Sequence, residues 1–177
     1  MNYNSIIEQR IQKKRKILVE ATDIPLIELN SKLQGMTHKA VIQFVFIATL
    51  PIRITLKRAL PSCTLVDEAF STVQQWARGE IKMSLAKQKI LNLHAYAKTI
   101  EDSSLIALFH AYAQGLSCVH TKKHAMGLPI YELTAIIHQN LYGDYEKILT
   151  QKVKEYLEII DQIPEDLNDK PWAKFIH

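Results

Sequence analysis

The sequence predicts an all-α protein, a single-domain bundle of about seven to eight helices. Its 177 residues include only 5 Gly and 6 Pro, whereas a sandwich or barrel of many short strands needs frequent turn residues. Hydrophobic residues make up 47% and charged residues 23% of the chain, as is ordinary for a globular protein with a core of its own. The clearest amphipathic pattern places apolar residues three or four apart, as one face of a helix does: Leu105, Phe109, Tyr112, Leu116 and Val119.

The N-terminal segments predict two helices with a break between them. Ser5 can cap a first helix that runs to about Ala21. Asp23 is the expected N-cap of a second, short helix, because Pro25 suits its first turn and Gly35 suits its end.

Residues 38–59 have two interpretations. β-branched residues such as Val41 and Val45 would suit a buried strand. The segment is long, however, and it lies between clear helices. We therefore favour a buried helix that Thr37 caps and that Pro51 kinks or breaks.

The remaining chain predicts a series of helices and a tail. Thr64 and Asp67 resemble a capping box, and Gly79 is a good residue to follow the end of that helix. The tail, residues 163–177, is expected to pack on the body of the single domain, residues 1–177, as an extended or short helical segment. Further helices are expected over about 82–99, 105–119, 129–142 and 145–160.

The charge pattern permits an anionic partner without requiring one. The net charge is +4. Much of the excess lies in one basic run, which we interpret as the solvated face of the first helix. A nucleic-acid-binding module is an alternative interpretation of this run. Its members are Arg10, Lys13, Lys14, Arg15 and Lys16.

The sequence also predicts a cytoplasmic protein without membrane contact. Its most apolar stretch, residues 41–52, is shorter than the about 20 residues that a bilayer span needs. The N-terminus lacks the apolar region of a signal peptide. Cys63 and Cys118 are the only cysteines and neither lies in a CxxC motif, so we expect buried thiols in a reducing compartment.

Four histidines are the densest polar group. The segment His94-Ala95-Tyr96-Ala97 recurs as His110-Ala111-Tyr112-Ala113, on either side of a polar break, so both histidines could face one interior. His120 and His124 would share a face on an unbroken helix. We interpret all four as structural histidines and expect no metal. A metal site or metalloenzyme built on His94, His110, His120 and His124 is the alternative.

Other enzyme signatures are missing from the sequence. There is no G-x-S-x-G nucleophile motif, phosphate-binding loop or dinucleotide fingerprint. Acidic pairs such as Asp67-Glu68 and Glu101-Asp102 fall at expected helix starts, where they favour the helix dipole. We therefore expect no catalytic residues.

The segment from Thr72 to Leu133 resembles the immunity proteins of bacterial polymorphic toxin systems. Three motifs carry the resemblance, and the chain departs from the family pattern at Gln114, where a histidine is usual, and at Pro129. The motifs are Trp76-Ala77-Arg78-Gly79-Glu80, Leu93-His94-Ala95-Tyr96-Ala97-Lys98, and His120-Thr121-Lys122-Lys123-His124-Ala125-Met126-Gly127 followed by Tyr131-Glu132-Leu133.

The resemblance implies an all-helical protein without enzymatic activity or cofactor. Such a protein would bind and neutralise a cognate toxin inside the producing cell. Immunity proteins that cover the basic active site of a nuclease are often acidic, so the net positive charge does not favour a nuclease partner. The candidate partner-binding residues are Trp76, Arg78, Glu80, His94, His110, His120 and His124.

Overall fold

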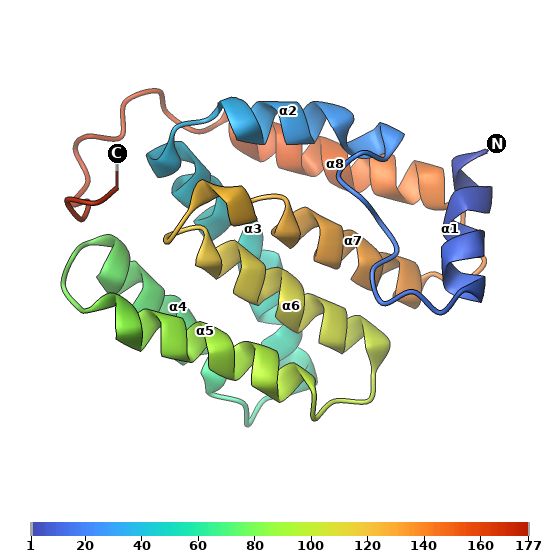
Figure 1. Ribbon diagram of the computed structural model, residues 1–177, viewed down its shortest axis with the longest axis horizontal. Coiled ribbons are helices and arrows are strands. Elements are labelled where there is room, and N and C mark those ends of the chain that lie inside the picture. Colours follow the sequence, from blue (N-terminus) through green and yellow to red (C-terminus); the bar gives the residue numbers. More distant parts are fainter. Residues whose placement is uncertain (1, 177) are drawn as a thin grey trace.

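The computed structural model describes residues 2–176, and all of the regular secondary structure in that range is helical. Within that range it has eight α-helices, two short 3-10 helices and no strand, which confirms the predicted all-α bundle. Figure 1 shows the arrangement. The elements are α1 (Tyr3–Gln12), η1 (Ile24–Leu26), α2 (Ile27–Gly35), α3 (His38–Ala59), α4 (Leu65–Ala77), α5 (Met83–Ala97), α6 (Ser103–Ser117), η2 (Lys122–His124), α7 (Gly127–Gln139) and α8 (Tyr145–Asp161).

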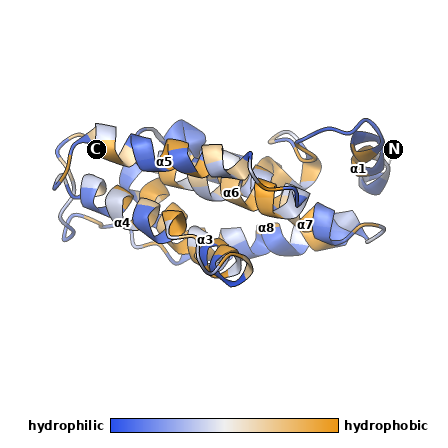
Figure 2. Ribbon diagram, turned by 90° about the horizontal axis from the view of Figure 1, so that it is seen from below, coloured by the Kyte–Doolittle hydropathy of each residue, from blue (hydrophilic) through white to orange (hydrophobic). Residues whose placement is uncertain are grey.

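Helix α6 is the centre of the bundle. It packs against α3, α4, α5 and α7, and its predicted apolar face is buried, with Phe109, Tyr112 and Leu116 fully enclosed. Seen from below, α5 and α6 lie in one layer over α3 and α4 (Figure 2). Helices α1 and α2 contact α8 at the other side of the molecule (Figure 1).

Helix α3 is continuous from His38 to Ala59, so the strand interpretation is wrong and Pro51 does not break the helix. Thr37 caps it as predicted, because its side chain accepts a hydrogen bond from the Ala40 N–H. Proline has no N–H, so Pro51 cannot donate to the carbonyl four residues earlier in the helix. Pro51 lies on the exposed face of α3, where water can hydrogen-bond that carbonyl instead.

By length and composition alone, α3 is the one helix among residues 2–176 that could cross a membrane. Of its most apolar window, 44% is buried against the rest of the protein. Phe44, Val45 and Leu56 are fully enclosed. This burial is that of a helix in the core of a bundle.

The first helix ends much earlier than predicted. Its N-cap is Asn2 rather than Ser5, and it stops at Gln12 rather than near Ala21. On a longer helix, Lys13 and Lys14 would lie three and four residues from Arg10, where like charges repel. Lys14 instead adopts a left-handed φ of 52°. The basic run is therefore not one helix face, because only Arg10 lies within α1.

Long-range contacts hold the segment that follows α1. The Leu18 N–H donates to Thr134 Oγ1 of α7 at 3.1 Å, and Leu18 and Val19 are fully buried. Arg10 pairs with Asp23 through two hydrogen bonds of 2.5 and 2.8 Å. Asp23 therefore does not cap the next helix with its side chain, although it occupies that position.

The start of α4 differs from the predicted capping box. Thr64 makes no capping hydrogen bond, and its hydroxyl donates to Glu68 instead. Asp67 forms ion pairs with Arg53 and Lys57 of α3. These pairs satisfy the carboxylate that a capping box would otherwise use.

The ends of α4 and α7 give one confirmed prediction and one wrong boundary. Gly79 follows the end of α4 with a left-handed φ of 77°, as a glycine after a helix often does. Helix α7 ends at Gln139, before the predicted Tyr142, whose own φ of 72° is outside the helical region. Asp102 and Asp144 cap α6 and α8.

The tail after α8 lies along the body without forming a helix in residues 162–176. The Ala173 N–H donates to the Ala77 carbonyl at the end of α4 at 2.7 Å. Ala173 and Ile176 are buried, and the Trp172 indole donates to the Leu167 carbonyl. The tail thus covers the C-terminal end of α4.

Candidate partner-binding site

His94 of α5 and His110 of α6 form a pair between two adjacent helices. Their Nδ1 atoms lie 2.8 Å apart and their ring centroids 5.0 Å apart. One ring must donate and the other accept, so this contact cannot hold two imidazolium ions. Burial lowers the pKa of both histidines, and the charge of Lys98 lowers both further. Both rings are therefore neutral near pH 7.

His120 packs on Trp76 at the end of α4. Their ring centroids are 4.0 Å apart, and Phe175 of the tail stacks on Trp76 at 5.2 Å. The Nδ1 atom of His120 is buried without a hydrogen-bond partner among residues 2–176. Burial, then the charges of His124 and Lys87, lower the pKa of His120 to about 4. Trp76 is only 3% exposed, so it holds the tail rather than projecting from the surface.

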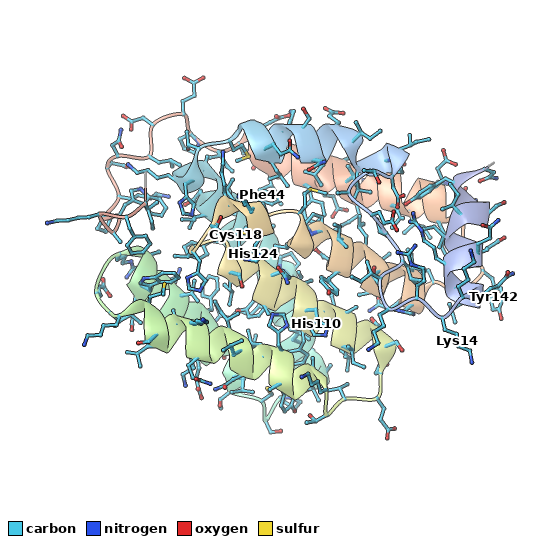
Figure 3. All side chains as sticks on the ribbon, in the orientation of Figure 1. Lys14, Phe44, His110, Cys118, His124 and Tyr142 are labelled. Carbon is cyan, nitrogen blue, oxygen red and sulfur yellow. The ribbon has the colours of Figure 1, made fainter. Side chains whose placement is uncertain are left out.

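His124 lies in the connection between α6 and α7, exposed to solvent. Its Nδ1 is 3.1 Å from Oε1 of Gln114, the α6 residue at which the chain departs from the expected family pattern. His124 is close enough to both His94 and His120 to lower the pKa of each. Figure 3 shows His110 on α6 and His124 beyond the end of that helix.

The four histidines therefore form an extended row, in the order His110, His94, His124 and His120, which we call the histidine row. Helix α6 ends at Ser117, so His120 and His124 do not share a helix face. Of the four predicted ligands, the structure brings only His94 and His110 into direct contact. Residues 2–176 contain no group of three or more His, Cys, Asp or Glu side chains that could hold a metal ion.

Arg78 and Glu80 lie at the surface just after α4. Their side chains are about half exposed and 3.8 Å apart, which makes a weak ion pair. Arg78 also borders a groove of about 560 Å³ between α3, α4 and the tail, with Phe46, Leu50 and Trp172 among its walls. The structure thus places an arginine and exposed apolar side chains together, as protein interfaces often do.

The predicted basic run divides into buried and exposed parts. The Arg10 side chain is 11% exposed and is held by Asp23, so it cannot serve an external partner. The other four cations are exposed. Three of them, Lys14, Arg15 and Lys16, also line one side of a cleft of about 610 Å³. Lys98, His110 and Tyr131 also line this cleft, which the sequence did not predict.

A buried polar group on α7 and α8 was also missed by the sequence analysis. Glu132 is 6% exposed, accepts a short hydrogen bond from the Tyr156 hydroxyl and pairs with Lys152 at 3.1 Å. Burial raises the pKa of Glu132, although Lys152 and Tyr156 oppose that shift. The sequence does show polar residues among apolar neighbours on α7 and on α8. That pattern does not show that Glu132 of one helix meets Lys152 and Tyr156 of the other.

Comparison with known proteins identifies the family. A family model described as Imm-5 like putative immunity protein matches residues 31–159, from α2 to the last turns of α8. The chain belongs to this family. The match confirms the resemblance seen in the three motifs and extends it over most of the chain. No curated protein and no solved structure matches the chain.

The matched segment of the chain contains the histidine row, Trp76, Arg78 and Glu80. The basic run and the tail lie outside it. The cleft walled by Lys14 and Lys16 therefore joins residues of the family segment to residues before it.

Proposed function

We propose that the protein binds a cognate toxin and neutralises it by protein–protein contact in the cytoplasm of the producing cell, without catalysing a reaction. The observation that carries this proposal is the family match over residues 31–159. All of the partner-binding residues predicted from the sequence fall within that segment.

Exposure divides these residues into two groups. Arg78, Glu80 and His124 are exposed, and the His94–His110 pair is partly exposed. These five side chains are the ones that we assign to partner contact. Trp76 and His120 support them, because His120 packs on Trp76 and the Trp76 ring stacks on Phe175 of the tail.

The surroundings of the histidine pair support binding over catalysis. The His94 and His110 rings hydrogen-bond each other. Among residues 2–176, neither ring forms a hydrogen bond with a hydroxyl, thiol or carboxylate. A general base needs a nucleophile or substrate within reach, and a carboxylate or carbonyl often orients it. Two neutral imidazoles in mutual contact offer neither arrangement.

Co-expression with a toxin tests this function. The toxin to use is the product of a toxin-like gene beside the gene for this protein in its source genome. We expect the wild-type protein to restore growth to cells that express the toxin and to co-purify with it. The assignment to that toxin is wrong if the protein neither binds it nor protects the cells.

Alanine variants then test the assigned surface. Truncation of an interface anchor costs roughly 1 kcal/mol or more, about a fivefold loss of affinity. We expect such a loss for at least one of Arg78→Ala and His124→Ala. The matched control is Lys154→Ala, on an exposed face of α8. Stoichiometric zinc or iron in untagged protein, lost in His94→Ala and His110→Ala, would instead favour the metal-binding alternative.

A further inference from the structure

The cleft beside α1 has an apolar floor and a positively charged rim. The segment after α1, the turn between α5 and α6, and helices α6 and α7 surround it. Ile17, Ile100 and Ile106 line its apolar part. Its volume of about 610 Å³ is within the range of sites that enclose a ligand or a few side chains. We call this feature the basic cleft.

The rim of the basic cleft carries cations without internal partners. Lys14, Lys16 and Lys98 are exposed, and none makes an ion pair or side-chain hydrogen bond with another residue of the described chain. Arg15 differs, because it pairs with Glu20 at 2.7 Å. No acidic residue of the described range 2–176 lines the cleft. Three like charges around one apolar hollow repel one another, and an anion between them would relieve that repulsion.

Asp102 lies in the same turn between α5 and α6 as Lys98, and its carboxylate is already engaged by the backbone. Burial lowers the pKa of the cleft residue His138, and the charge of Asp102 opposes that shift. The Asp102 carboxylate caps α6 by accepting the Leu105 N–H. Among the described residues, neither Asp102 nor Glu20 forms an ion pair with Lys14, Lys16 or Lys98.

The backbone that carries two of these lysines is held in place. Arg10 donates to the Leu18 carbonyl at 3.0 Å, and the Leu18 N–H bonds to Thr134 of α7. Lys14 has a left-handed φ of 52°, which a residue with a side chain rarely adopts unless its surroundings impose it. Figure 3 shows Lys14 on the turn that leaves α1. The cations are thus preorganised on a fixed segment.

We propose that the basic cleft receives an acidic segment of the protein partner, with carboxylates at Lys14, Lys16 and Lys98 and an apolar side chain on the isoleucine floor. This inference rests on the proposed function and gives the partner's chemistry at one site. His110 lines the cleft and also ends the histidine row. The cleft is therefore continuous with the surface assigned to the partner.

The floor favours a polypeptide over a nucleic acid. Single-stranded nucleic acids bind to proteins largely by stacking bases on free aromatic faces. Tyr131 already packs against His110, with ring centroids 5.2 Å apart, and the partly buried His138 is the other aromatic ring among the described lining residues. Isoleucine side chains offer contact to a leucine or valine but no stacking platform.

A peptide-binding measurement tests the chemistry without the toxin. The probe is a short peptide in which glutamate alternates with leucine, and the comparison ligands are an all-glutamate peptide, a lysine–leucine peptide and single-stranded DNA. The cleft variant is Lys14→Glu/Lys16→Glu/Lys98→Glu. The matched control has the same net charge and changes exposed lysines elsewhere, Lys82→Glu/Lys147→Glu/Lys154→Glu.

We expect the glutamate–leucine peptide to bind the wild-type protein and the control alike, and the cleft variant at least about tenfold more weakly. Equal binding to both variants would overturn the proposal. Tighter binding of DNA or of the all-glutamate peptide than of the probe would also overturn it. The neutral variant Lys14→Gln/Lys16→Gln/Lys98→Gln repeats the comparison if three reversals lower the unfolding midpoint.

The toxin assay separates this inference from the proposed function. If wild-type protein protects cells and the cleft variant protects them as well as the control does, the acidic-segment proposal fails and the immunity function stands. If the wild-type protein binds the acidic probe at the cleft but protects against no neighbouring toxin, the proposed function fails instead. Loss of protection in the cleft variant alone supports both.

Discussion

At the scale of single residues, the buried carboxylate of Asp23 holds the N-terminal segment through several hydrogen bonds. Its carboxylate accepts hydrogen bonds from Arg10, the Tyr3 hydroxyl and the Glu20 N–H. Burial alone would raise the pKa of Asp23, but the hydrogen bonds from Arg10, Glu20 and Tyr3 lower it below its usual value. The carboxylate therefore fixes the segment that leads from α1 to the basic cleft.

Replacing Asp23 should be costly because it leaves a buried cation behind. We expect Asp23→Ala to lower the free energy of unfolding by about 3–5 kcal/mol, since Arg10 and Tyr3 lose their shared acceptor. Urea unfolding at neutral pH measures this change. The control is Asp161→Ala, which removes an exposed pair with Lys32 and should cost less than about 1 kcal/mol. Equal losses would show that Asp23 does not hold this segment.

At the scale of helices, local pattern was sufficient where a helix begins and ends through its own residues. The apolar spacing of α6 and the polar break before it predicted its position. Likewise, Thr37 marked the start of α3 and Gly79 the end of α4. The end of α1 depends on contacts between Leu18 and Thr134 and between Arg10 and Asp23, which no local pattern contains.

The candidate site was predictable to a similar extent. The repeated His-Ala-Tyr-Ala segment suggested that His94 and His110 could face one interior, and the two rings meet between α5 and α6. The basic cleft was not predictable, because Lys16 and Lys98 come from segments far apart in the sequence that only the packed bundle brings together. The contacts of Trp76 with His120 and Phe175 are of the same long-range kind.

Close packing of α6 against its neighbours gives a prediction for Gly115. A Cβ at this position would lie 2.8 Å from Leu128 of α7 and 2.9 Å from Thr49 of α3. We expect Gly115→Ala to lower the free energy of unfolding by about 1–3 kcal/mol, despite the better helix propensity of alanine. Gly35→Ala is the control, because a Cβ there meets nothing within 4 Å. A Gly115→Ala protein as stable as Gly35→Ala would contradict this account of the α6 contacts.

At the scale of the whole molecule, the partly buried histidines make stability depend on pH. The folded-state pKa of His120 is about 4, below the ordinary value of 6.5, and those of His94, His110 and His138 are also lowered. As pH falls, the unfolded chain binds protons before the folded protein does. The contribution of these neutral histidines to the free energy of unfolding is therefore complete above pH 6.5. It is lost progressively as the pH falls from 6.5 through about 4.

The variant His120→Phe tests how much of this dependence comes from the ring on Trp76. Phenylalanine keeps an aromatic contact with Trp76 and removes both the titration and the unpartnered Nδ1. We expect wild-type protein to be less stable at about pH 5 than at about pH 7.5 in urea unfolding, and the difference to shrink in the variant. Asp23 does not confuse this comparison, because its lowered pKa places its own loss of stability at lower pH. If the stability difference between about pH 5 and about pH 7.5 is unchanged in His120→Phe, the pH dependence comes from the His94–His110 pair and His138 instead. Their pKa values are also lowered, so they lose their contribution over the same pH range.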